Sequence, residues 1–205
     1  GAVVHKPAGA GAWTVLALNW QSLLPALAAE FGDVAPHLYR VCAGPDQGAI
    51  AVGEYGAVVE LGEGEPRASR AGHDTLFACV VLPDRSVLVA GQSGSMWRRG
   101  ATDATWQRVE SPLSGDIFDL TADSGELLVV SDNVLSRGAI DGNRLSVTAT
   151  SHIASPWLLR ALKVQDKLLL LGQHGYGLVD AASALVVQHA KTSSSVTASA
   201  RPTDR

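Results

Sequence analysis

Three charged residues recur at one position of a repeated apolar segment and could do chemistry together. Arg40, Asp119 and Arg160 each take the third place of such a segment, and Tyr39 precedes Arg40. Paired arginines bind a carboxylate, and a tyrosine nucleophile with a glutamate and an acidic proton donor would complete a glycoside-cleaving site. No glutamate falls in these segments. We therefore expect a salt-bridged channel lining without catalysis, with binding of a polar ligand or peptide as the alternative.

The histidines and cysteines form no pattern that is typical of a catalytic or metal site. His37, His73 and His152 each precede one of these segments, and we expect them to bond neighbouring turns because a three-histidine metal site is geometrically demanding. Cys42 and Cys79 lie one register apart on such segments. Adjacent residues of a strand face opposite sides, so we predict buried free thiols and no disulfide. The sequence predicts no enzyme activity, no metal and no cofactor.

The elements that would position these residues come from an internal repeat of about 40 residues. A strand, a small residue, two polar residues and a second strand recur around Gly53, Gly91, Ser131 and Gly172, which stand 38, 40 and 41 residues apart. An upstream phrase keeps this period, and its copies begin at Leu38, Leu76, Ile117 and Leu158. Four short strands per repeat predict an all-β propeller of four-stranded blades whose first strands line a channel. An irregular sandwich or solenoid is the runner-up.

Domain boundaries follow from the same alignment. Residues 1–16 match the third and fourth strands of a repeat and predict a half blade. Extra residues at 20–33 (WQSLLPALAAEFGD) carry apolar side chains at helical spacing and predict a short helical insertion. We expect one propeller over residues 1–190, a polar tail at 191–205 that cannot fold alone, and four full blades. The predicted blades are 36–70, 73–110, 115–150 and 156–190.

Glycines mark the turn between the second and third strands, where a residue with positive φ is often needed. The two most complete copies are Val52–Leu61 (VGEYGAVVEL) and Ala90–Trp106 (AGQSGSMWRRGATDATW). The third copy has lost both glycines, so we expect its turn to be distorted.

This motif resembles the Ycf48/Hcf136-like propellers, which belong to the BNR and sialidase-like repeats. The resemblance covers residues 36–190 and the half repeat, although only Thr105 and Trp106 remain of the Asp-box in the best copy. It implies a non-enzymatic assembly factor that binds a polypeptide partner. Two alternatives stay open. One is a structural subunit of a large assembly such as a phage tail or secretion apparatus, and the other is a carbohydrate-binding or degenerate glycosidase-like propeller.

Composition narrows the partners. The 205 residues include 20 acidic and 16 basic ones, for a net charge of -4, which argues against nucleic-acid binding. The apolar runs are too short to span a bilayer, so we expect no direct membrane insertion. The sequence does not identify the cellular compartment, and it favours an extracytoplasmic or virion-associated location over the cytoplasm.

One face of the predicted propeller collects the Gly-x-x-Gly turns, the loops that enter the first strands and the helical insertion. Loops on a rigid scaffold concentrate binding residues, so we predict a contact with a protein partner there, with apolar anchors from the insertion. The alternative is that the insertion only caps the propeller. The predicted contact residues are Trp20, Leu24, Leu27, Phe31, Tyr55, Gln92, Gln173 and His174.

Overall fold

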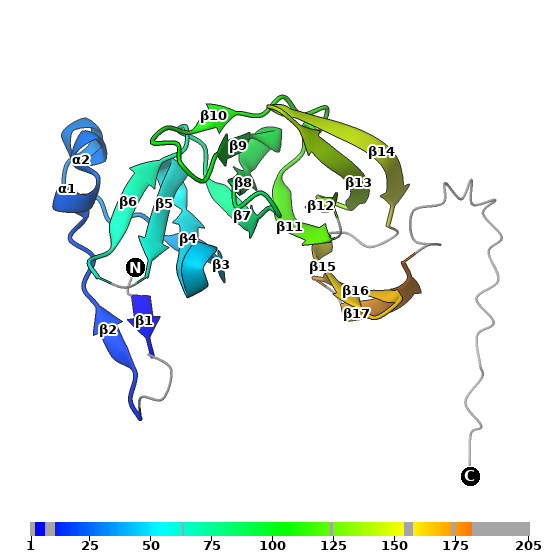
Figure 1. The fold of residues 1–205 in the computed structure, drawn as a ribbon, viewed down its shortest axis with the longest axis horizontal. Helices are drawn as coiled ribbons and strands as arrows, with labels where there is room; N and C mark the ends of the chain where they lie inside the picture. Colours follow the sequence, from blue (N-terminus) through cyan, green and yellow to red (C-terminus); the bar gives the residue numbers. More distant parts are fainter. Residues whose placement is uncertain are drawn as a thin grey trace, which may run out of the picture.

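The computed structural model describes residues 3–6, 11–62, 64–123, 125–153, 158–173 and 175–181. A hairpin of β1 (Val3–His5) and β2 (Thr14–Leu16) comes first, followed by helices α1 (Trp20–Leu23) and α2 (Pro25–Phe31). Four antiparallel sheets then follow one another along an arc (Figure 1). The predicted all-β propeller fold is confirmed.

Each sheet is one blade, in which the strands pair in chain order from the innermost outwards. Blade 1 contains β3 (Leu38–Ala43), β4 (Ala49–Gly53), β5 (Ala57–Leu61) and β6 (Arg67–Arg70). Blade 2 contains β7 (Leu76–Val81), β8 (Val87–Gly91), β9 (Met96–Arg99) and β10 (Gln107–Arg108). Blade 3 contains β11 (Ile117–Asp123), β12 (Glu126–Ser131), β13 (Val134–Asp141) and β14 (Arg144–His152). Blade 4 contains β15 (Leu158–Val164), β16 (Lys167–Gly172) and β17 (Gly175–Asp180).

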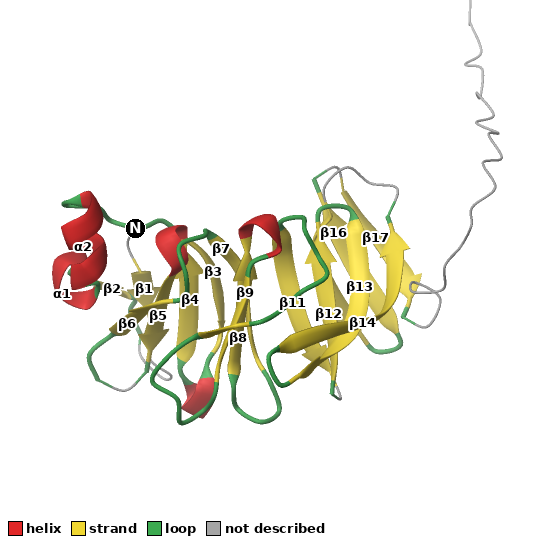
Figure 2. Ribbon diagram, turned by 90° about the horizontal axis from the view of Figure 1, so that it is seen from above, coloured by secondary structure: helices red, strands yellow, loops and turns green. Residues whose placement is uncertain are grey.

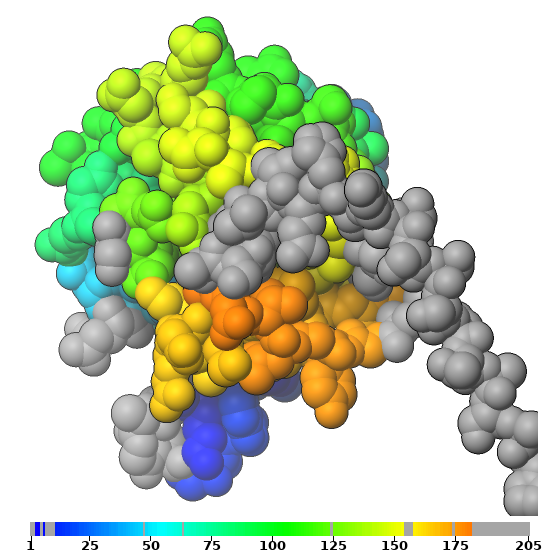
Figure 3. All heavy atoms as spheres, turned by 90° about the vertical axis from the view of Figure 1, so that its right-hand side faces the viewer, coloured from blue at the N-terminus to red at the C-terminus, as the bar shows by residue number. Residues whose placement is uncertain are grey.

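Blade 4 ends the described part of the arc, and Figure 3 views the molecule from that end. The fourth strand predicted for this blade and the predicted polar tail lie outside the described residues. At the other end, α1 and α2 stand beside blade 1 (Figure 2).

Alternate residues of each second strand pack against different neighbours, because successive side chains of a strand point to opposite faces. In β8, Val87 and Val89 join a core shared with blade 1, whereas Leu88 and Ala90 join a core shared with blade 3. We call the side of a blade toward the earlier blade its preceding face and the other side its following face. Every interface between blades therefore joins a following face to a preceding face.

The prediction of free thiols was wrong, because Cys42 of β3 and Cys79 of β7 form a disulfide with their Cα atoms 6.0 Å apart. Cys42 pairs with Ile50 on the following face of blade 1, and Cys79 pairs with Val89 on the preceding face of blade 2. Within one sheet, two residues that are one register apart point to opposite faces. Across two stacked blades the same shift turns them toward each other, because the following face of one blade meets the preceding face of the next.

The Gly-x-x-Gly turns of blades 1 and 2 are short 3-10 turns, and both glycines are needed. Gly94 has a φ of 72°, which disfavours L side chains, while a Cβ on the extended Gly91 would collide with the carbonyl oxygen of Thr75. Blade 3, which lacks these glycines, turns instead through a two-residue hairpin that pairs Ser131 with Val134. Blade 4 keeps the glycines in sequence yet also turns as a direct hairpin.

The predicted helical insertion consists of two short helices. The side chain of Asn19 caps α1 by accepting a hydrogen bond from the Ser22 amide, and Pro25 begins α2 at a position where its missing N–H costs nothing. The helices cover the preceding face of blade 1, where another blade would otherwise pack. The core between them contains Trp20, Leu24, Leu27, Ala51, Ala57 and Val59.

Candidate functional site

A β-bulge interrupts the same place in all four innermost strands. The pairing with the second strand skips one residue, which is the second residue of each strand. A bulged residue leaves the ladder and its side chain is re-aimed. We call these four residues the mouth ledge. They lie at the N-terminal end of each innermost strand, beside the turn that joins the second and third strands of the blade. The ledge is Tyr39, Phe77, Phe118 and Leu159.

Three rings of the mouth ledge form a continuous row across blades 1 to 3. The ring centroids of Tyr39 and Phe77 lie 5.7 Å apart, and those of Phe77 and Phe118 lie 5.5 Å apart. These distances are typical of favourable aromatic pairs. Tyr39 is 54% exposed and Leu159 is also exposed, while the two phenylalanines are half-buried. The ledge therefore offers solvent an apolar surface whose rings support one another.

Glu54 fixes the orientation of Tyr39. The carboxylate accepts a hydrogen bond of 3.1 Å from the Tyr39 hydroxyl and one of 2.9 Å from the backbone N–H of His37, and His37 Nδ1 lies 2.9 Å away. The backbone hydrogen bond from His37 is the main cause that lowers the pKa of Glu54. The hydrogen bond to Glu54 raises the pKa of Tyr39, so the phenol stays a neutral donor.

Below the ledge, the structure brings Arg40, Asp119 and Arg160 together. Buried Asp119 forms an ion pair with Arg40, lies 4.0 Å from Arg160 Nε, and accepts a 3.1 Å hydrogen bond from the Ala161 amide. Burial raises the pKa of Asp119, although Arg40 and the Ala161 amide act in the opposite direction. Burial also lowers the pKa of Arg40. One carboxylate thus links blades 1, 3 and 4, and it is enclosed by its partners.

Carboxylates border the mouth ledge on the loops and turns of blades 1 to 3. Asp74 and Asp132 are exposed, and Asp116 and Glu54 are half-buried. Asp116 also joins two blades, because it accepts a 2.8 Å hydrogen bond from the Ser93 amide in the turn of blade 2. We call these four residues the acidic rim.

The insertion residues predicted as anchors divide into two groups. Trp20, Leu24 and Leu27 are buried against blade 1. Phe31 is 45% exposed and its ring lies 5.0 Å from that of Tyr55. Of these four side chains, only Phe31 offers a partner substantial apolar surface.

The remaining predicted contact residues lie on the turns. Gln92 and Gln173 are exposed, and His174 lies outside the described residues. The sequence analysis did not predict the mouth ledge. The signal that could have found it is a large apolar residue, aromatic in three of four copies, at the second place of each innermost strand.

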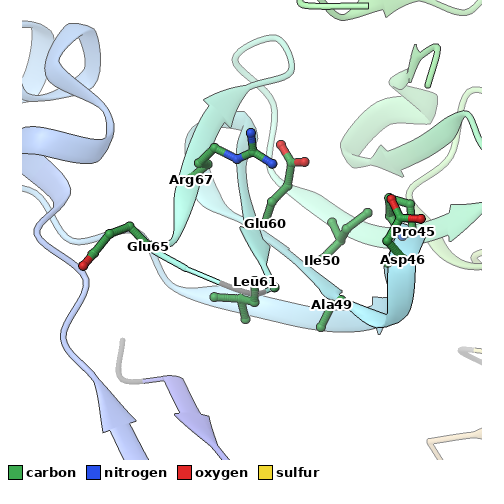
Figure 4. A pocket seen from close by; sticks show the side chains of 11 residues that line it. Pro45, Asp46, Ala49, Ile50, Glu60, Leu61, Glu65 and Arg67 are labelled. Carbon is green, nitrogen blue, oxygen red and sulfur yellow. The ribbon is translucent and has the colours of Figure 1, made fainter. Parts of the chain in front are cut away.

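A pocket of about 520 Å³ opens at the opposite end of blade 1 (Figure 4). It lies between the β3–β4 loop, with Pro45 and Asp46, and the β5–β6 connection, with Glu60 and Arg67 in its wall. Glu60 is already paired with Arg99 at 2.8 Å. Within the described ranges, no group of three or more His, Cys, Asp or Glu side chains could hold a metal ion. We therefore take the mouth ledge and the acidic rim, which together we call the channel mouth, as the candidate site.

Comparison with known proteins supports the propeller fold. No family model and no curated protein matches this chain. A chain of the crystal structure of the mitotic checkpoint complex matches with a TM-score of 0.57 and 14% identity, over 68% of this chain and 47% of that one. An extracellular domain assigned to a one-component system of B. thetaiotaomicron matches with a TM-score of 0.60 and 13% identity, over 86% and 24%. At these identities the likeness shows the fold alone, and this chain spans less than half of both.

A structure of YCF48 bound to D1 peptide also matches, with 12% identity over 72% of this chain and 68% of that one. Its TM-score of 0.35 is too low to carry an argument. Among the described helices, none has the length and apolar character that crossing a membrane requires.

Proposed function

We propose that this protein is a non-enzymatic propeller that binds a polypeptide partner at its channel mouth, as an assembly factor of the kind that the sequence resemblance implies. The observation that carries this proposal is the mouth ledge, an apolar row that repeats in all four blades and includes exposed Tyr39. Rigid exposed aromatic side chains contribute most to binding energy at protein interfaces. The hydrogen bond from Tyr39 to Glu54 and the ring contacts with Phe77 and Phe118 hold this row in place without a partner.

The acidic rim defines the chemistry of the partner. Glu54 bonds Tyr39 of the ledge, and Asp74, Asp116 and Asp132 lie on loops and turns at the same end of the blades. Below the ledge, Asp119 is paired with Arg40 and lies 4.0 Å from half-exposed Arg160. Carboxylates attract basic side chains, and the faces of aromatic rings bind cations. The partner segment should therefore combine apolar side chains with lysine or arginine.

A displayed library of random peptides tests this proposal directly. We expect selection on the immobilised protein to enrich peptides that carry apolar and basic residues. Synthetic copies of these peptides would then be titrated by fluorescence anisotropy. Tyr39→Ala and Leu159→Ala should each weaken binding roughly tenfold, which corresponds to about 1.4 kcal/mol. Added salt should weaken binding further, because exposed charges are screened.

Val164→Ala is the matched control, since Val164 is an exposed apolar residue at the opposite end of the strand that carries Leu159. It should leave the affinity unchanged. The proposal is wrong if no peptide is enriched, or if the selected peptides bind Tyr39→Ala and Leu159→Ala as tightly as the parent protein.

A further inference from the structure

The following face of blade 4 is apolar and exposed. Leu171 pairs with Tyr176, and Leu169 pairs with both Leu178 and Leu162, so these five side chains share one face. Tyr176 is 82% exposed and Leu178 is 57% exposed. In Figure 3 the orange residues of β16 and β17 lie at the surface of this end of the molecule. Large exposed apolar patches mark interaction sites.

The equivalent positions of the other three blades show what such a face receives. Leu171 and Tyr176 correspond to pairs that are completely or almost completely buried, and each of these pairs packs against the next blade. Blade 4 therefore has the apolar pattern of a face that receives another blade. The buried pairs are Val52–Val58, Ala90–Met96 and Val130–Leu135.

The N-terminal hairpin exposes the complementary kind of face. Val4 pairs with Val15, and both are more than half exposed, as is Trp13 at 67%. The repeat alignment equates Val4 with Trp97 and Trp13 with Trp106. Both tryptophans pack into the core between blades 1 and 2, from the side of blade 2. Val4, Trp13 and Val15 therefore form a face of the preceding kind that is exposed among the described residues.

We propose that two copies of this chain associate head to tail, with the preceding face of one hairpin packed on the following face of the partner's blade 4. This pairing repeats the face-to-face rule of the three interfaces inside the chain. The preceding face of blade 1 cannot take this role, because α1 and α2 cover it. The high exposure of Trp13 and Tyr176 shows that the hairpin and blade 4 of one chain do not pack on each other.

Light scattering after size exclusion tests the association. The chain has a mass of 21.3 kDa, and we expect species of at least twice that mass whose fraction rises with concentration. Trp13→Glu removes one face and Tyr176→Glu removes the other. Each variant alone should be monomeric, since a heterologous contact needs both faces. Circular dichroism would confirm that these exposed substitutions leave the fold intact.

Mixing the two variants gives the decisive result. Trp13→Glu keeps an intact blade 4 and Tyr176→Glu keeps an intact hairpin, so together they should form a 1:1 pair that cannot grow further. A Tyr39→Ala control should associate like the parent protein, which separates this proposal from the mouth site. A parent protein that stays monomeric overturns the proposal. So does a Trp13→Glu variant that still associates alone, because blade 4 would then pair with itself.

Discussion

The apolar outer faces of blade 1 and blade 4, at the two ends of the arc, differ in how they are covered. At blade 1, two helices bury Trp20, Leu24 and Leu27 against the preceding face of the sheet. At blade 4, the following face leaves Tyr176 and Leu178 in solvent. Both faces belong to copies of the same repeat, so the difference between them lies in what covers each face. The helices cover the face at one end, and the face at the other end is exposed among the described residues.

The contacts between neighbouring inner strands become weaker from blade 1 to blade 4. At one equivalent position, blades 1 and 2 are joined by a disulfide, and blades 2 and 3 by an apolar contact. Blades 3 and 4 are joined by a 3.2 Å hydrogen bond from Thr121 Oγ1 to the carbonyl of Ala161. The equivalent pairs are Cys42–Cys79, Val80–Leu120 and Thr121–Ala161. We therefore expect stability to decrease from the capped end to the open end.

Loss of the disulfide should have the largest effect. Its cysteines are separated by 37 residues in the sequence, and closure of such a loop stabilises a protein by about 3–4 kcal/mol in the chain-entropy account. The Cys42→Ala/Cys79→Ala variant should lose about this free energy of unfolding in urea, and reductant should lower the parent protein to a similar level. Thr121→Ala, at the open end, should cost much less. An unchanged urea midpoint in reductant would contradict the interblade bond.

Matched leucine truncations compare the two ends most directly. Leu27→Ala should destabilise the protein by about 3 kcal/mol, because it leaves a cavity under the helices. Leu178→Ala removes an exposed side chain and should change stability by less than about 0.5 kcal/mol. Urea denaturation below the concentration at which copies associate would measure both. Equal losses would show that the two faces are covered alike.

Asp119→Asn should have the next largest effect on stability, because Asp119 links blades 1, 3 and 4. The amide can still accept from Ala161, but largely buried Arg40 loses its counter-charge. We expect a loss of about 2 kcal/mol in free energy of unfolding. Arg160→Gln is the control, since half-exposed Arg160 lies 4.0 Å away and should contribute less than about 0.5 kcal/mol. Similar losses for both variants would refute a dominant Arg40 pair.

The smallest effect should be a pH dependence from Glu54 at the rim of blade 1. Its pKa in the folded state is below the ordinary value, so its stabilising contribution is present above that value and is lost as the pH falls through the folded-state pKa. Glu54→Gln should reduce the stability difference between neutral pH and about pH 3 by less than 1 kcal/mol. An Asp132→Asn variant, on the exposed turn of blade 3, provides the comparison. An unchanged pH profile for Glu54→Gln would contradict this role.

The repeat carried most of the fold and part of the site. Residues at one place in every repeat must converge on a central channel, and this is why Arg40, Asp119 and Arg160 could be grouped from sequence. The disulfide was missed because the cysteines were compared within one sheet, whereas blades meet through opposite faces. The apolar spacing of residues 20–33 predicted a helix but could not show which side chains blade 1 would bury. The mouth ledge was missed because the large apolar residue at the second place of each innermost strand looks like any other strand residue, and the sequence does not show that a bulge re-aims it.

The bulges also separate binding from folding in the history of such a chain. A ledge residue lies outside the ladder of its blade, so its side chain can change while the flanking backbone pairs stay the same. There are four such positions, one per blade, and the ring contacts couple those of blades 1 to 3. A lineage could therefore acquire a new partner through a few substitutions at the mouth and inherit the rest of the propeller unaltered.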